Sequence, residues 1–420
     1  MIARLKRAFA WIGPTAAITL MLMNQSAYAL KGIVVDGKTE KPISGAIVTF
    51  NGQTVSSDGS GAFEIAGTGK LVAARAAGYQ RADLAISGDG SPVALHLEPF
   101  SPRALYLSFY GVGSRSLRES ALALIRQTEL NAVVIDIKGD HGLVAYPTAN
   151  PLAEAIGARR ITTIPDLAAL NRAFHSEHIY TIARIVVFKD DPLATERPEL
   201  AVKREDGTLF RDREKLAWID PFRSEAWDYN VSLAVDAAAA GFDEIQFDYV
   251  RFPDNPHVRF SGANTQATRI QAIKGFLMRA KEKLRPYNVF LAVDVFGYTC
   301  WNTDDTHIGQ RLEDYSPLVD YVSPMLYPSG FQFGIPGCSN PVSRPYEIVY
   351  RSLERARQRT GETPKHFRPW LQVFKDYAFD RRVFDSDEVR AQIKAANDFG
   401  SSGWMLWNPR NVYQDLGLPP

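Results

Sequence analysis

Apolar runs of two kinds follow one another along the chain. From residue 30 to about residue 98 they are brief alternating stretches between turn residues, and after residue 102 they are separated by longer segments with helical periodicity. Alternation with a period of two is typical of half-buried strands, whereas a period near 3.6 is typical of helices. The pattern therefore predicts a small all-β domain followed by a larger α/β domain.

The first part reads as short strands joined by tight turns. Turn dipeptides such as Asp-Gly and Asn-Gly recur between the apolar stretches, and regular short strands with such turns indicate a β-sandwich. Strands are expected at 32–35, 46–50, 62–65, 71–74 and 93–97. Two prolines, Pro99 and Pro102, mark the boundary, so the sandwich is expected over 30–99 and the α/β domain over 103–420.

The second part predicts eight strands that alternate with seven helices. This alternation favours a parallel sheet, and the length fits a (β/α)8 TIM barrel. An open doubly wound sheet is the alternative, which we disfavour because no G-x-G-x-x-G turn follows an early strand. The strands are expected at 103–111, 131–139, 180–189, 244–253, 289–297, 321–328, 368–374 and 403–409. The helices are expected at 116–129, 165–178, 223–240, 265–285, 306–318, 345–359 and 387–399.

The first 29 residues have the pattern of a secretory signal peptide. Basic residues at positions 4, 6 and 7 precede an apolar run over 8–23, which leads to Ala27-Tyr28-Ala29. The run is shorter than the ~20 residues that span a bilayer, and Gly13-Pro14 interrupts it, so an uncleaved anchor is disfavoured. We expect cleavage after Ala29, a periplasmic or secreted protein, and no stable membrane anchor.

Composition narrows the choice of partners. The 420 residues include 48 Lys and Arg against 47 Asp and Glu; removal of residues 1–29, which hold three basic and no acidic groups, leaves 45 against 47. A near-neutral chain without a long basic run lacks the electrostatic footprint of a nucleic-acid-binding protein. A nucleic-acid partner is therefore not expected.

Two cysteines, Cys300 and Cys338, form the single possible disulfide. An oxidising compartment favours the bond, while the alternative is a pair of buried inert thiols, because free cysteine packs like a small apolar side chain. A metal site is disfavoured, since neither cysteine has a second Cys or a His at ligand spacing.

Acidic residues end three of the expected barrel strands. Asp136 ends the second strand, Asp248 the fourth and Asp294 the fifth, and chemistry in such barrels occurs at the carboxyl ends of the strands. If the alternating side chains place them inward, three carboxylates meet in one cavity. Buried charges need partners, and the expected counter-ions are Lys138, Arg184 and Arg251.

Carboxylates across a cavity suit glycoside hydrolysis, in which one group is ionised and the other is held protonated. Aromatic rings with polar edges match sugar surfaces, although a single tryptophan is more often a core residue. Arg251 and Tyr249 are expected to contribute directly only if the fourth strand ends in a turn at 252–253. The expected sugar-binding side chains on the rim are Tyr249, Tyr298, Trp301, Tyr327, Gln372, Trp407 and Asn408.

Four motifs carry a resemblance to a known family. They are G-F-D-E-I-Q-F-D-Y-V-R-F-P at 241–253, S-P-M-L-Y-P-S at 323–329, R-P-W-L-Q at 368–372 and G-W-M-L-W-N-P at 403–409. They resemble the bacterial putative glycosyl hydrolase domain family, over essentially all of residues 103–415. The resemblance implies a TIM barrel of the glycoside hydrolase superfamily, without a known substrate.

Similarity to retaining barrel glycosidases implies that Asp248 is the nucleophile. The partner acid is expected to be Asp294, with Asp136 as second choice. One departure stands out, because an acidic residue commonly follows the R-P-W-L-Q motif in the family and Val373 stands there in this chain.

The first domain resembles another known module. K-P-I-S-G-A at 41–46, S-D-G-S-G-A-F at 57–63 and A-A-G-Y at 76–79 are similar to the carboxypeptidase regulatory-like, transthyretin-like module. The resemblance implies a structural or adhesive role, and glycan binding is an alternative.

Three functions follow from these residues. The first is an exported glycoside hydrolase that cleaves a cell-envelope or extracellular polysaccharide without a cofactor. The second is an inactive barrel that binds glycans or serves as a scaffold. The third, a metal-dependent deacetylase with Asp136, His141 and Asp248 as ligands, is disfavoured because the histidines form no H-x-H or H-E-x-x-H spacing.

Overall fold

The computed structural model describes residues 28–87, 90–414 and 416–420. Most of the expected signal peptide lies outside this range. The first described element is strand β1 (Tyr28–Asp36), in which Ala29 pairs with Ala66, so the expected cleavage after Ala29 falls within this strand. Among the described residues, no helix is both long and apolar enough to span a membrane.

The first domain consists of two sheets that enclose an apolar core. One sheet has the order β4 (Ala62–Gly67), β1, β7 (Val93–Leu97), and the other has the order β3 (Gln53–Ser56), β2 (Ile47–Phe50), β5 (Leu71–Arg75), β6 (Ala82–Ala85). Side chains of both sheets, such as Val34 and Phe50, are fully buried in one cluster. The five expected strands are present, while β3 and β6 are strands of four residues each that the apolar pattern missed.

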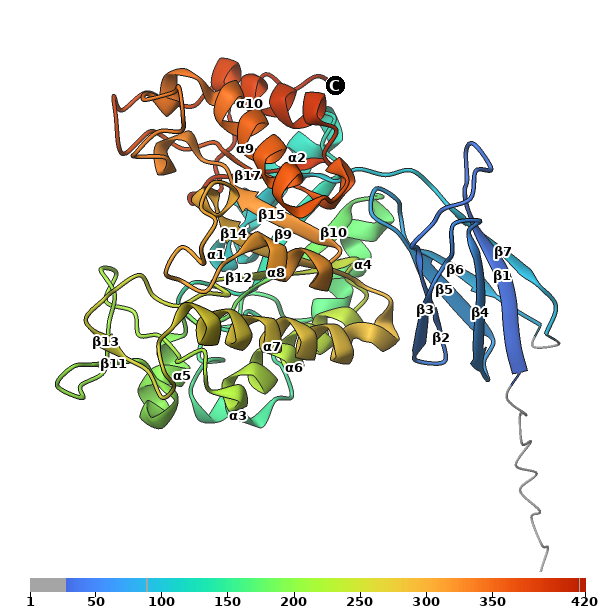
Figure 1. Ribbon diagram of the computed structural model, residues 1–420, viewed down its shortest axis with the longest axis horizontal. Helices are drawn as coiled ribbons and strands as arrows, with labels where there is room; N and C mark the ends of the chain where they lie inside the picture. Colours follow the sequence, from blue (N-terminus) through green and yellow to red (C-terminus); the bar gives the residue numbers. More distant parts are fainter. Residues whose placement is uncertain (1–27, 88–89, 415) are drawn as a thin grey trace, which may run out of the picture.

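The second domain is a closed barrel of eight parallel strands with helices around it (Figure 1). All eight strands lie within the expected segments. They are β8 (Arg103–Leu107), β9 (Ala132–Lys138), β10 (Tyr180–Val186), β12 (Glu244–Asp248), β14 (Phe290–Phe296), β15 (Tyr321–Met325), β16 (Trp370–Gln372) and β17 (Trp404–Trp407). The small β11 (Lys203–Arg204) and β13 (Val258–Arg259) pair with each other outside the barrel.

Six of the seven expected helices form as long helices. They are α2 (Arg115–Gln127), α4 (Leu167–Ser176), α6 (Ser224–Ala239), α7 (Gln266–Leu284), α9 (Pro345–Thr360) and α10 (Ser386–Phe399), and the short helices α1 (Phe109–Gly113), α3 (Pro151–Ala155) and α5 (Asp191–Glu196) accompany them. Local chemistry sets their ends, since Thr265 caps α7 and Gly361 and Gly400 follow α9 and α10 with positive φ.

The helix expected over 306–318 is the exception. Only α8 (Leu312–Tyr315) and a short 3-10 turn form there. The carboxylate of Asp305 accepts hydrogen bonds from the backbone N–H groups of His307 and Gly309, and Thr306 and His307 have positive φ. These side-chain bonds compete with helical ones, so the segment turns instead.

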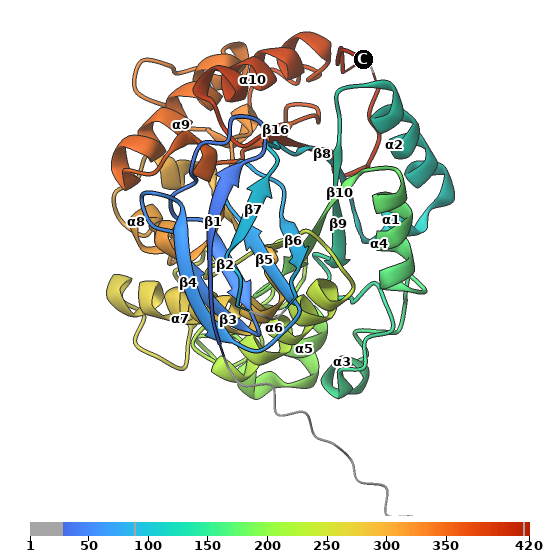
Figure 2. The same cartoon turned by 90° about the vertical axis from the view of Figure 1, so that its right-hand side faces the viewer.

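The β-domain lies against the end of the barrel at which the strands begin (Figures 1 and 2). Arg75 of β5 bonds Asn288 and Asp320, which precede β14 and β15, and Tyr321 accepts a bond from the backbone of Gly78. The carboxyl ends of the strands are therefore at the other end, where barrels of this type place their chemistry.

Candidate active site

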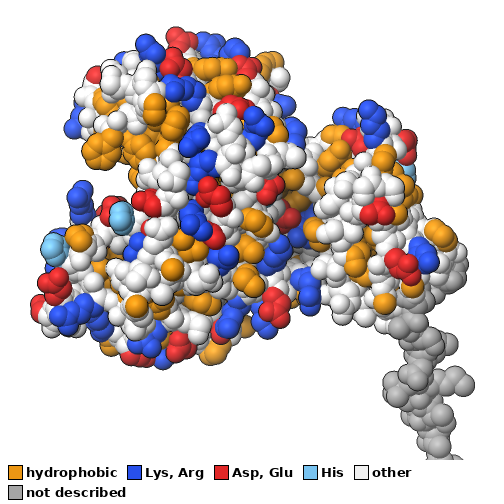
Figure 3. Space-filling view, in the orientation of Figure 1, with side chains coloured by type: hydrophobic (Ala, Val, Ile, Leu, Met, Phe, Trp, Pro, Cys, Tyr) orange, Lys and Arg blue, Asp and Glu red, His pale blue; other side chains and the backbone are white. Residues whose placement is uncertain are grey.

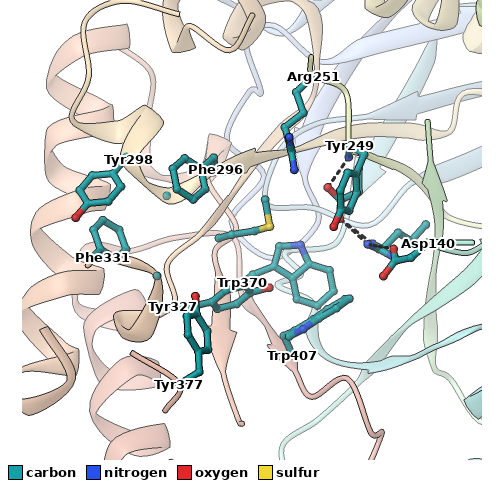
Figure 4. A pocket seen from close by; sticks show the side chains of 15 residues that line it. Asp140, Tyr249, Arg251, Phe296, Tyr298, Tyr327, Phe331, Trp370, Tyr377 and Trp407 are labelled. Atoms are coloured by element: carbon teal, nitrogen blue, oxygen red, sulfur yellow. Dashed lines mark hydrogen bonds and ion pairs between the residues drawn. The ribbon is translucent and has the colours of Figure 1, made fainter. Parts of the chain in front are cut away.

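A cavity of about 250 Å³ opens at the carboxyl ends of the barrel strands. Figure 3 shows the molecule hollowed on its left edge, with hydrophobic side chains gathered above the hollow, and Figure 4 shows the cavity from close by. Its walls combine aromatic rings with a few charged groups. The lining residues are Asp140, Arg184, Asp248, Tyr249, Arg251, Phe296, Gly297, Tyr298, Met325, Tyr327, Gly330, Phe331, Trp370, Tyr377 and Trp407.

Arg184 of β10 is the electrostatic centre of the cavity floor. Its Nη2 lies 2.6 Å from Asp248 Oδ2 and 3.2 Å from Asp140 Oδ1, its Nε lies 3.1 Å from Asp248 Oδ2, and its Nη1 lies 2.6 Å from Asp136 Oδ1. The planar fork of an arginine suits such multiple carboxylate contacts. One fully buried cation therefore holds three carboxylates of neighbouring strands and loops in place.

Asp248, at the end of β12, is the carboxylate that the strands present to the cavity. Besides its two bonds to Arg184, it accepts a bond of 2.5 Å from the backbone N–H of Tyr249 through Oδ1. These bonds hold the Asp248 carboxylate in a fixed orientation at the cavity floor.

Asp294 lies behind Asp248 and does not line the cavity. Its side chain is fully buried; Oδ1 accepts a 2.8 Å bond from the indole N–H of Trp370, and Oδ2 has no hydrogen-bond partner among the described residues. Burial, together with the Asp248 charge, raises the pKa of Asp294 well above its usual range, and Arg184 only partly opposes this. The surroundings of Asp294 therefore favour its neutral form.

Asp136, the other expected acid, is also beneath the cavity surface. It accepts a 2.6 Å bond from the hydroxyl of Tyr106 as well as its bond from Arg184. Burial raises the pKa of Asp136 to about 6, against the influence of Arg184. The expectation that three carboxylates reach one cavity is therefore met only by Asp248; the other two support the floor from below.

A turn at the end of β12 brings Tyr249 and Arg251 to the same cavity as Asp248. Tyr249 has φ +51°, so the strand ends at Asp248 and the alternation of side chains stops there. The turn expected at 252–253 comes earlier, and both side chains point into the cavity (Figure 4). A non-glycine residue with positive φ stores roughly 1–3 kcal/mol of strain, a feature that gathers at functional sites.

A β-bulge removes Lys138 from the site. The pairing of β10 with β9 joins Arg184 to Asp136 but Ile185 to Lys138, so one extra residue stands in β9. The bulge turns the fully buried Lys138 outward, where it pairs with Asp190 at 2.8 Å. Lys138 is therefore not the expected counter-ion of the cavity carboxylates.

Three further expected sugar-binding residues lie outside the cavity. Trp301 donates its indole N–H to Ser352 of α9, which places it on the flank of the barrel. The side-chain amide of the fully buried Gln372 forms hydrogen bonds with Ser329 and with a backbone carbonyl. The amide of Asn408 forms hydrogen bonds with backbone groups of its own turn. Their polar groups are satisfied within the protein, so they position loops. The expected Tyr298, Tyr327 and Trp407 do line the cavity.

The expected disulfide is absent. Cys300 and Cys338 are both free and buried, each within the apolar core around the barrel. Burial raises the pKa of the Cys300 thiol to about 12, which makes it unreactive. The alternative, two buried inert thiols, describes them correctly.

The sequence reasoning missed four cavity residues with a charged or aromatic side chain, besides Gly297, Met325 and Gly330. Asp140 follows β9 and its side chain is 36% exposed, while Phe296, Phe331 and Tyr377 supply aromatic surface. Asp140 and Phe296 stand at or just after a strand end, and this position was the available signal. Phe331 and Tyr377 lie in loops, whose course the apolar pattern does not predict.

The residues of the metal alternative do not form a metal site. Arg184 stands between Asp136 and Asp248, so a guanidinium already fills the place that a cation would take. Within the described part of the chain, no three His, Cys, Asp or Glu side chains gather in a way that could hold a metal ion.

The family model described as "Putative glycosyl hydrolase domain" matches residues 104–413, the whole barrel. The chain belongs to this family. A hypothetical protein from Ruminiclostridium thermocellum ATCC 27405 is 39% identical, over 46% of this chain and 97% of its own, with a TM-score of 0.41. No curated protein matches the sequence. The family that the four motifs indicated is confirmed.

Solved structures agree with the barrel fold. The glycoside hydrolase domain of PgaB (BpsB) from Bordetella bronchiseptica superposes with a TM-score of 0.53 at 14% identity, over 74% of this chain and 95% of its own. The C-terminal domain of a putative chitinase from Desulfitobacterium hafniense DCB-2 reaches 0.48 at 12% identity, over 75% and 95%. The likeness to the first of these structures and the closed eight-stranded barrel confirm the expected TIM-barrel fold. The all-β first domain is consistent with a regulatory-like module, whose exact kinship stays a prediction.

Proposed function

We propose that this protein is an exported glycoside hydrolase that cleaves a cell-envelope or extracellular polysaccharide. The observation that carries the proposal is Asp248, a carboxylate on the floor of an aromatic cavity, with the buried carboxyl group of Asp294, whose pKa is raised, directly behind it. Membership in the glycosyl hydrolase domain family supports the reaction class. Export rests on the signal-peptide pattern of residues 1–29.

Asp140 replaces Asp294 in our proposal as the second catalytic carboxyl group. Asp140 Oδ1 and Asp248 Oδ2 lie 3.2 Å and 2.6 Å from the same Arg184 nitrogen, so these oxygens are less than about 6 Å apart. Retaining glycosidases place their two carboxyl groups ~5–5.5 Å apart, and inverting ones ~6.5–9.5 Å apart. This upper limit on the distance between the two oxygens favours a retaining mechanism. Asp248 is then the nucleophile, and Asp140 is the acid that protonates the leaving oxygen.

The side chains around this pair have supporting roles. The raised pKa of Asp294 favours its neutral form, and a neutral group does not repel the carboxylate of Asp248. Burial is the main cause that raises the pKa of Tyr327 well above its usual range, so its hydroxyl keeps its proton and can donate to a sugar or to developing charge. Trp370 and Trp407, whose ring planes are 88° apart, offer apolar faces to a sugar ring.

The first test is hydrolysis of a panel of envelope and extracellular polysaccharides, measured as release of reducing ends. Asp248→Asn should remove cleavage by at least about a thousandfold, because an amide is no nucleophile, and should leave the fold intact. The matched control is Asp228→Asn, an exposed carboxylate of α6, which should cleave like the parent. Glycan binding with no cleavage by the parent protein would refute the enzyme and favour the scaffold.

The second test separates the two carboxyl groups. A glycoside with a very acidic phenol as leaving group needs no protonation, so Asp140→Asn should keep most activity on it while losing activity on natural glycans. Asp248→Asn should lose both. Equal losses on both substrates for the two variants would contradict the assigned roles.

A further inference from the structure

The two arginines of the cavity differ in their electrostatic surroundings. Arg184 has carboxylate partners on all three guanidinium nitrogens. Arg251 has none within ion-pair distance in the part of the chain that the structure describes, and the hydrogen bond it makes there runs from Nη1 to the backbone carbonyl of Phe252 at 3.2 Å. A cation on the cavity wall therefore has free donors.

Arg251 is held in a fixed orientation by two aromatic rings. Its guanidinium carbon lies 4.9 Å from the ring centre of Trp218 and 4.8 Å from that of Tyr249. Trp218 is buried and anchored by its indole N–H on Asp212, and the positive φ of Tyr249 fixes the second ring. The two ring centres lie 5.5 Å from each other, so the rings meet the guanidinium from one side and leave N–H donors on its edge free to bind.

The free edge points into the cavity. Figure 4 shows Arg251 entering from the top, with Tyr249 beside it and Trp370 below it. Asp248 lies on the same cavity, three residues earlier in the chain, so a sugar held at Asp248 brings its substituents close to this edge. The position suits recognition of a group next to the scissile bond.

We infer that Arg251 binds the carboxylate of an acidic sugar, so that the substrate is a carboxylate-bearing glycan. The inference rests on the proposed function and specifies its substrate class. A half-buried cation with free donors gains most from a planar anion that accepts two parallel bonds. A singly charged carboxylate also fits better than a dianionic phosphate, because the proposed nucleophile Asp248 lines the same cavity and repels further negative charge.

Binding measurements with the full chain carrying Asp248→Asn test this without turnover. The probes are oligosaccharides that contain glucuronate, with the acid on the ring, and peptide-free glycan strands that contain muramic acid, with the acid on a lactyl arm. Each is compared by calorimetry with the same glycan after its carboxylates are reduced to alcohols. One of the two acidic probes should bind at least about tenfold more tightly than its reduced form.

A second substitution assigns this preference to Arg251. Adding Arg251→Gln should remove the tenfold difference between the acidic and the reduced glycan, while Arg251→Lys should keep only part of it because an ammonium lacks the fork. Arg351→Gln is the matched control, since Arg351 stacks on Trp301 outside the cavity. Melting temperatures of all variants check that the fold is kept.

Three results would overturn the inference: equal affinity for acidic and reduced glycans, an acid preference that survives Arg251→Gln, or no binding of either acidic probe. A protein that binds acidic glycans through Arg251 but hydrolyses none would instead refute the proposed reaction and leave the binding role intact. Cleavage of neutral glycans alone would support the proposed reaction and refute a carboxylate-bearing substrate.

Discussion

At the scale of single residues, the cavity depends on the match between Arg184 and its carboxylates. The sequence predicted Arg184 as a counter-ion and Asp248 as the central acid, because both stand on inward positions of neighbouring strands, where their register differs by two residues. It could not predict which acids stay accessible. That depends on Trp370 and Tyr106, which bond Asp294 and Asp136 from other strands and cover them.

Replacing Arg184 with methionine should destabilise the whole barrel. Removal of one partner of a buried ion pair leaves uncompensated charge and costs about 3–5 kcal/mol. We expect such a loss in the free energy of unfolding, measured by urea titration at pH 7. Arg279→Met, which breaks an exposed pair with Asp228, should change it by less than about 1 kcal/mol. Similar losses in the two variants would contradict the assigned network.

Asp136 gives a prediction on pH. Its pKa is raised to about 6 from an ordinary value of 3.8, so the folded state binds more protons than the unfolded one between these limits. Stability from this group is present below pH 4 and is lost as pH rises towards 6, roughly 3 kcal/mol in all. Asp136→Asn should therefore flatten the fall in unfolding free energy between pH 4 and pH 6, measured by urea titration at several pH values. An unchanged slope would show that Asp136 does not cause the fall in unfolding free energy over this pH range.

At the scale of elements, periodicity predicted the strands and the inward face, and local irregularities decided the site. The inward positions of β12 and β14 hold Gln246, Asp248 and Asp294, as alternation requires. The bulge in β9 and the turn at Tyr249 break the same alternation, and neither leaves a signal in hydrophobic periodicity. The differences between the expected and the observed site residues therefore arise from irregular backbone at the strand ends.

The loop after β16 shows how one acid can position a cavity wall. Asp376 accepts hydrogen bonds from Ser329 and from the backbone N–H groups of residues 378–381. Burial alone would raise the pKa of Asp376, but these bonds outweigh it and lower the pKa to about 2. An acid near the family's strand-seven motif is thus present three residues beyond Val373, in a structural role.

Asp376→Ala should loosen this loop and displace Tyr377 from the cavity. Since Tyr377 lines the cavity and Asp376 does not, we expect KM for a glycan substrate to rise about tenfold while kcat changes by less than about threefold. Steady-state kinetics separate the two constants. Tyr377→Ala should give the same pattern, and a loss confined to kcat would argue against a positioning role for Asp376.

At the scale of the whole molecule, the sequence predicted both domains but not how they meet. Strand number, helix spacing and the motifs indicated a barrel, because each is local in the chain. The contact between the domains joins Arg75 to Asn288 and Asp320, more than 200 residues away in sequence, and no local pattern announces such a pair. The contact also places the β-domain at the end of the barrel opposite the cavity, which argues for a structural role rather than for help in substrate binding.

Arg75→Met tests that role. Arg75 is almost fully buried, with Nη1 2.8 Å from Asn288 Oδ1 and Nε 3.2 Å from Asp320 Oδ2, and Asp320 also accepts a bond from the backbone of Leu291 in β14. Loss of these hydrogen bonds from a charged donor should cost about 1–3 kcal/mol of unfolding free energy, although Asn288 and Asp320 keep their bonds from Thr49 and Leu291. Because the cavity is at the far end of the barrel, kcat/KM should stay within about twofold of the parent value, a change below the ~1 kcal/mol that a lost contact to substrate costs.

Two comparisons make the result specific. Lys31→Met breaks an exposed ion pair with Glu64 on the same β-domain, away from the barrel, and should leave stability nearly unchanged. A variant that lacks residues 30–99 should unfold at least as readily as Arg75→Met, because it exposes Phe100 and Tyr180, whose rings pack 5.3 Å apart at the base of the barrel. If Arg75→Met instead keeps full stability and loses glycan cleavage, the structural role is contradicted. The β-domain would then take part in the function of the barrel.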